Sequence, residues 1–331
     1  MIKENDGRKK TLKAPFPYFG GKSRVAGDVW SALGQPAHYI EPFFGSGAVL
    51  LNRPNYDSLK YTETINDADG YVANVWRSLQ FSPDEVAKWC DWPVNHADLI
   101  ARKARLIREK NYLLENLCKD DKWHDTELAG YWIWSVSCWI GSGLTRPSQR
   151  PHITDSGKGV HAKGKRPHIT NSGMGIHGVY KPSIYTWFRE LSERLRRVRV
   201  VCGDWTRVCG GNWQNKLGIC GIFFDPPYSV DRSDVYDIES YTVSHDVREW
   251  AIKRGKMEDY RIVIAGYFEE HESLLNHGWS VKTWSAGGGY ANQAKSDTPS
   301  RGQINKNKEA LFFSPHCIGN NKNDLISMMG E

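Results

Sequence analysis

An apolar run in the second half of the chain ends in the polar sequence DPPY, at residues 225–228. Ligands of open α/β sheets bind where such buried strands end. Two prolines fix the backbone and lack N–H groups, so that the neighbouring carbonyls are held outward. The Asp225 carboxylate and such a carbonyl can accept hydrogen bonds from an exocyclic amino group, while the Tyr228 ring stacks on the base. A rigid surface turn is the alternative, because short motifs recur by chance.

Two glycine-containing turns offer places where a ligand could approach the backbone closely. The sequence YIEPFFGSG at residues 39–47 is a strand-like run followed by Gly45 and Gly47, which permit a tight turn. It lacks the spacing of a dinucleotide site and the Lys-Ser/Thr pair of a phosphate loop, which argues against a dinucleotide or ATP. The sequence FPYFGGK at residues 16–22 allows another close turn, and Lys22 supplies a cation for a carboxylate.

Acidic residues follow two further strand-like runs. Asp67 comes about 20 residues after the glycine turn, a spacing that suits ribose hydroxyls. A helix N-cap at Asp67 or Asp69 is an equally good explanation. Asp204 and Trp205 follow the next strand-like run in the same way and offer a carboxylate and a ring to an adenine.

The elements that must position these residues alternate between strand and helix. Strand-like runs at 38–41 and 59–66 are each followed by a helix-like run, at 48–51 and 69–79. This order is typical of a parallel α/β sheet. The rhythm returns after residue 198, with strand-like runs at 199–202, 219–224, 261–265, 280–284 and 310–313 and helix-like runs at 247–254 and 269–276.

The middle of the chain has a different character. Residues 82–145 carry leucines and isoleucines at helical spacing, and residues 183–198 form a basic helix-like run. Between them, the sequence RPHITDSGKGVH at 150–161 recurs with few changes at 166–177, which favours two successive hairpins or loops. We therefore expect an insertion at 82–197 that interrupts a sheet domain.

Positive charge is concentrated in this insertion. The chain has 331 residues and a net charge of +6, whereas residues 146–200 alone contain 12 Lys/Arg and 3 Asp/Glu, which leaves a small negative charge for the rest. Nucleic acid is the natural partner of such a segment, because each neutralised phosphate releases counterions. A solvated basic face is the alternative.

Several other classes of protein are not expected. No apolar run reaches the roughly 18 residues of a membrane-spanning helix, and the charged N-terminus does not resemble a signal peptide, so we expect a cytoplasmic protein without a membrane partner. The seven cysteines include no CxxC pair, which argues against a zinc ribbon or a disulfide framework. No metal is expected, because no cysteine spacing supports the four histidines of the repeat, His152, His161, His168 and His177.

In combination, these segments resemble the Dam-like, α-group DNA adenine methyltransferases, which depend on S-adenosylmethionine. The resemblance rests on an ordered set of motifs: PxxGGK-like at 17–22, EPFxGxG at 41–47, acidic at 66–67, GD-aromatic at 203–205 and DPPY at 225–228. The run EALFFSP at 309–315 also looks like the closing strand of that family. The resemblance does not extend to residues 82–197.

The resemblance implies a fold and a domain organisation. The expected fold class is α/β, a Rossmann-like class I methyltransferase mixed sheet with an inserted helical and hairpin DNA-recognition domain. The expected parts are a disordered basic arm at 1–13, a catalytic, cofactor-binding domain at 14–81 and 198–318, a target-recognition insertion at 82–197 and a flexible tail at 319–331.

The resemblance also implies roles for single residues. The target adenine would be held by Asp225, Pro226, Pro227 and Tyr228. The cofactor would be lined by Tyr18, Gly21, Lys22, Glu41, Pro42, Phe43, Gly45, Gly47, Asp67, Asp204, Trp205 and Asp225. From their charge, the expected DNA contacts are Arg146, Arg150, Lys163, Lys165, Arg166, Arg194 and Arg197.

The expected reaction is transfer of a methyl group from S-adenosylmethionine to the N6 amino group of an adenine flipped out of double-stranded DNA. Compact size and the basic insertion fit an enzyme of a phage or mobile element. We expect a monomer or weak dimer, and a cognate restriction nuclease is a candidate partner.

Three rival functions are compatible with parts of this pattern. An N4-cytosine methyltransferase uses a related tetrapeptide, although Asp before Pro-Pro-Tyr favours adenine. An RNA methyltransferase is the second rival. A catalytically silent DNA-binding protein with the same fold is the third, and the intact residues Lys22, Asp67 and Asp225 argue against it.

Overall fold

The computed structural model describes residues 12–18, 21–139, 143–146, 183–227, 240–284 and 309–320. Most of the predicted N-terminal arm, the two-copy repeat and most of the C-terminal tail lie outside the described residues. The same holds for the predicted site residue Tyr228 and for the predicted DNA contacts Arg150, Lys163, Lys165 and Arg166.

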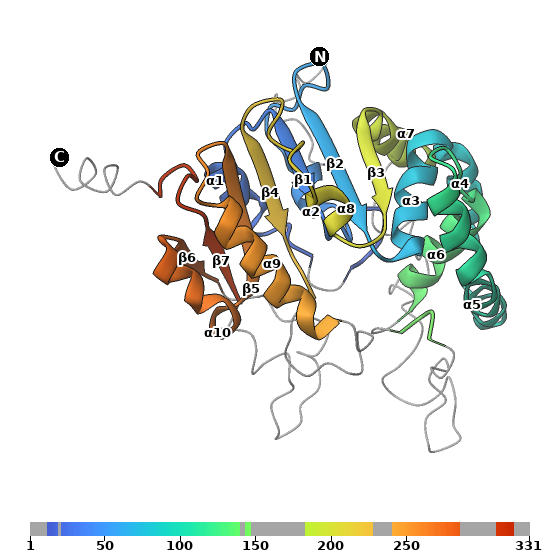
Figure 1. Cartoon of the computed structure of the whole chain (residues 1–331). Helices are drawn as coiled ribbons and strands as arrows, with labels where there is room; N and C mark the ends of the chain where they lie inside the picture. Colours follow the sequence, from blue (N-terminus) through green and yellow to red (C-terminus); the bar gives the residue numbers. More distant parts are fainter. Residues whose placement is uncertain are drawn as a thin grey trace, which may run out of the picture. The chain divides into compact units, whose positions relative to one another are not determined.

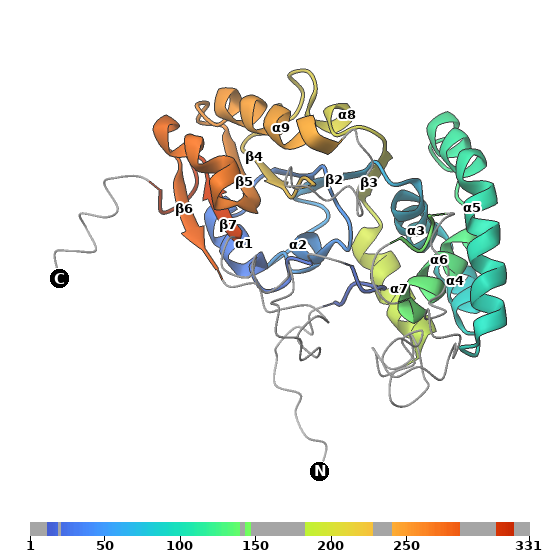
Figure 2. The ribbon, with the colours of Figure 1, turned by 90° about the horizontal axis from the view of Figure 1, so that it is seen from below.

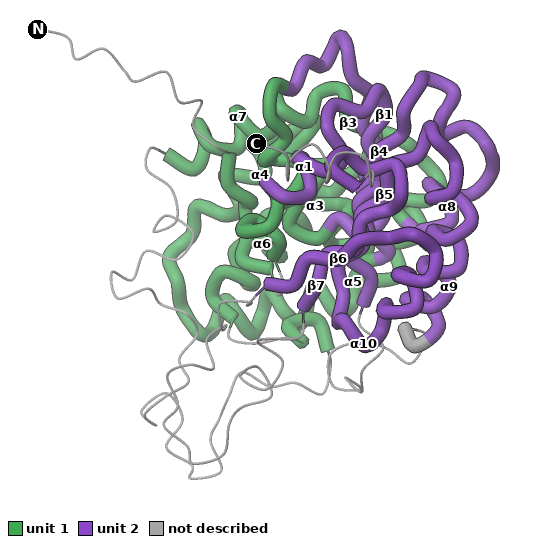
Figure 3. Tube along the Cα trace, turned by 90° about the vertical axis from the view of Figure 1, so that its left-hand side faces the viewer, with its two compact units in different colours: residues 1–26, 45–55, 69–202 green, residues 27–44, 56–68, 203–331 purple. Residues whose placement is uncertain are grey.

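The chain divides into two compact units (Figure 3). Unit 1 comprises residues 1–26, 45–55 and 69–202, and unit 2 comprises residues 27–44, 56–68 and 203–331. The boundaries of these units differ from those of the predicted catalytic domain and insertion. The reason is that the helix at 70–81, which belongs to the predicted catalytic domain, packs with the helices that follow it. The division into a catalytic domain and a recognition insertion stays a prediction.

A mixed sheet forms the centre of unit 2 (Figure 1). Of the seven strands in the described part of the chain, unit 2 contributes six, in the order β2-β1-β4-β5-β7-β6. Their bounds are β1 His38–Glu41, β2 Thr62–Asp67, β4 Cys220–Phe224, β5 Tyr260–Tyr267, β6 Ser280–Thr283 and β7 Glu309–Phe313. The pairs β1–β2, β1–β4 and β4–β5 are parallel, whereas β7 is antiparallel to both β5 and β6. The predicted mixed α/β sheet is confirmed.

Helices cover both faces of this sheet. Figure 2 shows α1 (Ala26–Leu33) on one face and α9 (Ser240–Arg254) on the other. Strand β4 is buried at all five positions, and its side chains alternate between these helices. A Cβ added at Gly221 would lie 3.6 Å from Leu33 of α1, whereas the ring of Phe224 lies 5.7 Å from that of Trp250 in α9. A strand covered on both faces is typical of the centre of a parallel sheet.

The short helices of unit 2 follow the ends of strands or loops. They are α8 (Thr206–Cys209), α10 (Phe268–His271) and the 3₁₀ helix η3 (Glu272–His277). Helix α10 directly follows β5 and packs against β5 and β7. Helix α8 packs against β2, and η3 packs against α9 and α10.

Unit 1 is mainly helical. Its elements are α2 (Ala48–Leu51), α3 (Gly70–Phe81), α4 (Pro83–Cys90), α5 (His96–Lys119), α6 (Thr126–Cys138), α7 (Ile184–Leu195) and the strand β3 (Val198–Cys202). Helix α3 packs against α5, α6 and α7. Its Arg77 donates hydrogen bonds to the carbonyls of Asp120 and Trp123, each at 3.1 Å, and so ties the end of α5 to α3. The helical character predicted for residues 82–145 is confirmed by α4, α5 and α6.

Within the described residues, no group of three or more His, Cys, Asp or Glu side chains could hold a metal ion. None of the helices in this part of the chain is both long and apolar enough to cross a membrane. All seven cysteines are free thiols, and only Cys118 is exposed.

Candidate functional site

Four parallel strands of unit 2 end at one edge of the sheet, and an acidic residue stands at the end of three of them, β1, β2 and β4. Glu41 ends β1, Asp67 ends β2, and Asp225 directly follows β4. Glu41 pairs with Ile65, so Asp67 lies two residues beyond the level of Glu41 in the sheet. Ile40 pairs with Ile222, so Asp225 also lies two residues beyond the level of Glu41.

Strand order places these residues at a known kind of binding position. Strand β1 lies between β2 and β4, so the chain passes from β1 to one side of the sheet and later continues on the other. Such a reversal opens a crevice outside the carboxyl ends of the strands, where ligands of open α/β sheets bind. Carboxylates on both sides of β1 suit a ligand that carries positive charge and hydroxyl or amino donors.

Asn66 connects three of the predicted motifs. Its side-chain Nδ2 donates hydrogen bonds to the carbonyl of Pro42 at 3.0 Å and to that of Gly203 at 2.9 Å. Its own carbonyl accepts a hydrogen bond from the N–H of Phe44 at 3.0 Å, and the carbonyl of Asp67 accepts one from the N–H of Gly203 at 3.0 Å. Segments 42–44, 66–67 and 203–205 therefore meet, as their joint assignment to one site requires.

The two explanations of the acidic motif can be separated. Helix α3 begins after Asp69, whose side chain accepts a hydrogen bond from the N–H of Tyr71 at 2.8 Å. Asp69 is therefore the N-cap, and Asp67 is not. Asp67 is half-buried at the end of β2. The N-cap function does not account for its carboxylate.

Glu41 is the most buried carboxylate of the edge, with 2% of its surface exposed. The hydroxyl of Tyr39 donates a hydrogen bond to Glu41 Oε2 at 2.9 Å. Residues 39 and 41 share one face of β1, and the Tyr39 ring packs against Trp30 of α1 at a centroid distance of 4.6 Å. This packing fixes the Tyr39 hydroxyl and, through it, the direction of the Glu41 carboxylate.

Aromatic packing holds the backbone that leads into DPPY. The ring of Phe224 lies 6.3 Å from that of Phe43, 6.0 Å from that of Trp205 and 5.7 Å from that of Trp250. Asp225 comes next and is half-buried, and Pro226 is buried. Asp225 therefore stands between a rigid strand end and two prolines, and the role of its carboxylate stays a prediction. Trp250 has no counterpart among the predicted site residues.

The remaining pair of this edge, Asp204 and Trp205, differs in exposure. Asp204 is exposed, and its Oδ1 accepts hydrogen bonds from the N–H of Thr206, at 3.0 Å, and from the Thr206 hydroxyl. Trp205 is 7% exposed, and its ring packs edge-on against Phe224 and Trp250. Much of this ring therefore belongs to the core. Its expected contact with an adenine stays a prediction.

Unit 1 contains the other predicted cofactor residues, Tyr18, Gly21, Lys22, Gly45 and Gly47. Gly45 and Gly47 have φ angles of 49° and 65°, which favour glycine. A Cβ at Gly45 would lie 2.6 Å from the ring of Tyr18, so the absence of a side chain permits this close packing. The carbonyl of Gly45 accepts a hydrogen bond from Trp76 Nε1 at 2.8 Å. Lys22 is buried in this unit.

Three of the predicted DNA contacts belong to the described residues. Arg197 is exposed, whereas Arg146 and Arg194 are half-buried. Nη2 of Arg194 donates a hydrogen bond to the carbonyl of Leu50 at 2.9 Å, which gives this side chain a structural contact. The carbonyl of Arg146 accepts a hydrogen bond from Lys103 Nζ at 2.8 Å. DNA contact by these residues stays a prediction.

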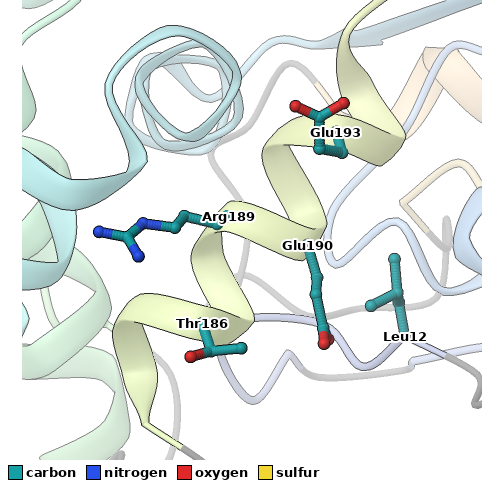
Figure 4. A pocket seen from close by; sticks show the side chains of 5 residues that line it. All are labelled: Leu12, Thr186, Arg189, Glu190 and Glu193. Carbon is teal, nitrogen blue, oxygen red and sulfur yellow. The ribbon is translucent and has the colours of Figure 1, made fainter.

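A hollow of about 490 Å³ lies elsewhere in unit 1 (Figure 4). It is lined by Leu12, Thr186, Arg189, Glu190 and Glu193. Arg189 points away from Leu12 in Figure 4. It forms a bidentate salt bridge with Asp84, in which Nε donates to Oδ1 at 2.7 Å and Nη2 donates to Oδ2 at 2.9 Å. The two glutamates leave this hollow without the positive charge that a phosphate backbone needs.

The comparison with protein families agrees with this geometry. Residues 18–113 match the family model of D12 class N6 adenine-specific DNA methyltransferases. No curated protein matches the sequence. The matched part includes the glycine turns, β1, β2 and the acidic motif. The family description also favours adenine in DNA over N4-cytosine or RNA as the methylated substrate. Over residues 18–113 the chain is therefore similar to the D12 class of N6 adenine-specific DNA methyltransferases, enzymes that use S-adenosylmethionine.

Proposed function

We propose that the carboxyl edge of β1, β2 and β4 in unit 2 binds both S-adenosylmethionine and the target adenine. The observation that carries this proposal is the common level of Asp67 and Asp225 on the two strands that flank β1. One carboxylate would serve the cofactor and the other the base. Their position at the reversal of strand order supports a single crevice for both ligands.

The side chains of this edge suit the cofactor. S-adenosylmethionine supplies an electrophilic methyl group on a positively charged sulfur. Asp67 would accept hydrogen bonds from the ribose hydroxyls, and the buried Glu41 adds negative charge beside a cationic ligand. Gly203 has a φ of 140°, and a Cβ there would clash with Nε of Arg207, so glycine permits the close packing of this segment beside Asp67. The unit 1 residues Tyr18, Gly21, Lys22, Gly45 and Gly47 stay predictions of the resemblance.

Asp225 and Pro226 would bind the amino group of the adenine. The two N–H bonds of that group would donate to the Asp225 carboxylate and to the Pro226 carbonyl. These hydrogen bonds raise the electron density on the nitrogen and orient its lone pair toward the methyl group. The packing of Phe224 against Trp205 and Trp250 would keep the two acceptors in place. Tyr228 would stack on the base.

Double-stranded DNA is the proposed substrate, because the excess positive charge of the chain lies in residues 146–200. The adenine amino group lies inside the duplex, so the base would have to be flipped out to reach Asp225. A cytoplasmic location agrees with such a substrate. The target sequence would be read by the predicted insertion.

The identity of the product tests this proposal. The purified full-length chain is incubated with S-adenosylmethionine and unmethylated DNA, and in parallel with RNA, and the hydrolysed nucleosides are identified by mass spectrometry. We expect N6-methyladenine in DNA. N4-methylcytosine, or methylation of RNA alone, would contradict the proposal. Binding of the cofactor with no methylated product on either substrate would favour a catalytically silent DNA-binding protein.

A further inference from the structure

Asn66 is a polar residue of unit 2 that is bonded to segments of the proposed site. It is not among the predicted site residues. Only 1% of its surface is exposed. Its side chain and main chain together contact residues 42, 44 and 203, which belong to two segments far apart in the sequence. Each of these segments contains predicted cofactor-binding residues. Asn66 itself stands directly before Asp67.

The geometry of this contact requires an amide. The two N–H bonds of Nδ2 are used on two different carbonyls, those of Pro42 and Gly203. If the amide were turned over, its oxygen would face both carbonyl oxygens. In the observed orientation Oδ1 is buried and has no hydrogen-bond partner. Buried acceptors are normally satisfied, so the two carbonyls determine the orientation of this side chain.

We infer that Asn66 is a positioning residue for the methyl-transfer reaction. Its amide fixes the loop after Glu41 and the segment 203–205 on either side of Asp67, and so sets the shape of the cofactor-binding edge. This inference rests on the proposed function of that edge. Loss of the two N–H donors would let both segments shift, and cofactor binding would suffer more than the chemistry of the bound complex.

Asn66→Asp removes both donors with little change in size. We expect the Kd of S-adenosylmethionine, measured by calorimetry, and its KM to rise about tenfold or more. The kcat at saturating cofactor should change less. Asn74→Asp is the matched control, because Asn74 is equally buried but bonds to the backbone N–H and carbonyl of Asp125 in unit 1. That variant should lose thermal stability while its Kd stays at the wild-type value.

The variants Asn66→Ser and Asp67→Asn distinguish a failure of this inference from a failure of the proposed cofactor site. Asn66→Ser retains one donor and should give an intermediate Kd, and it replaces Asn66→Asp if the latter does not fold. An unchanged Kd in a folded Asn66 variant, while Asp67→Asn weakens binding, would overturn this inference alone. An unchanged Kd in both Asp67→Asn and the Asn66 variant would instead overturn the proposed cofactor site.

Discussion

Asp67 and Asp225 reach the same level of the sheet from opposite sides of β1, each two residues beyond Glu41. The chain between them includes most of unit 1, so this relationship exists only in the folded sheet. Two carboxylates at one level of a parallel sheet give two acceptor positions at the same edge. We assign one of them to the cofactor and the other to the adenine.

Arg197 and Arg194 allow DNA contact to be separated from structural contact. Arg197 is exposed, so Arg197→Ala should lower the slope of log affinity against log salt by about 1 and leave stability almost unchanged. Arg194 donates to the carbonyl of Leu50, so Arg194→Ala should also lower the free energy of unfolding by about 1–2 kcal/mol. DNA binding over a range of salt concentrations and urea unfolding measure the two effects.

Lys256→Ala is the matched control for these arginine variants. Lys256 is an exposed cation of unit 2 that lies outside the predicted DNA-binding segment. Its removal should leave the salt slope unchanged. A wild-type slope in Arg197→Ala would contradict a phosphate contact by Arg197.

The stability of unit 2 should depend on pH through His271. Burial lowers the pKa of His271 below its ordinary value of 6.5. Between the two values the unfolded chain binds a proton that the folded chain does not. The contribution of His271 to the free energy of unfolding is therefore fully present above about pH 6.5. It is lost as the pH falls toward the folded pKa, by at most about 1.4 kcal/mol per pH unit.

Urea unfolding at about pH 7.5 and about pH 5 checks this dependence. His271 packs against the Phe312 ring at 5.7 Å, and its Nδ1 is buried without a hydrogen-bond partner. His271→Gln should therefore reduce the difference between the two pH values. His245 is exposed, so His245→Gln should keep the wild-type difference. Equal pH dependence in the wild type and in His271→Gln would show that another group is responsible.

Much of the sheet can be predicted from the sequence, because buried parallel strands are short apolar runs bounded by polar turns. The run at 38–41 coincides with β1, and the run at 219–224 contains β4. The strand predicted at 59–66 begins three residues later, at Thr62. The preceding residues from Asp57 form a turn, in which the N–H of Lys60 bonds to the Asp57 carbonyl at 3.2 Å.

Other features depend on tertiary contacts that no local pattern reveals. The sequence suggests no contact for the side chain of Asn66, and only the positions of Pro42 and Gly203 show what its amide does. The predicted arm includes Lys13, but the carbonyl of Lys13 accepts a hydrogen bond from Trp187 Nε1 at 3.1 Å within unit 1. A residue 174 positions away in the chain decides that contact.

Removal of the Asp225 carboxylate tests the central claim most directly. The rate of adenine methylation is measured under single-turnover conditions for the wild type, Asp225→Ala and the exposed control Asp246→Ala, together with the Kd of S-adenosylmethionine. We predict that Asp225→Ala lowers the rate by about 10²–10³-fold or more while cofactor binding stays largely intact, and that the control behaves as the wild type. A wild-type rate in Asp225→Ala would contradict the assignment of this carboxylate to the adenine.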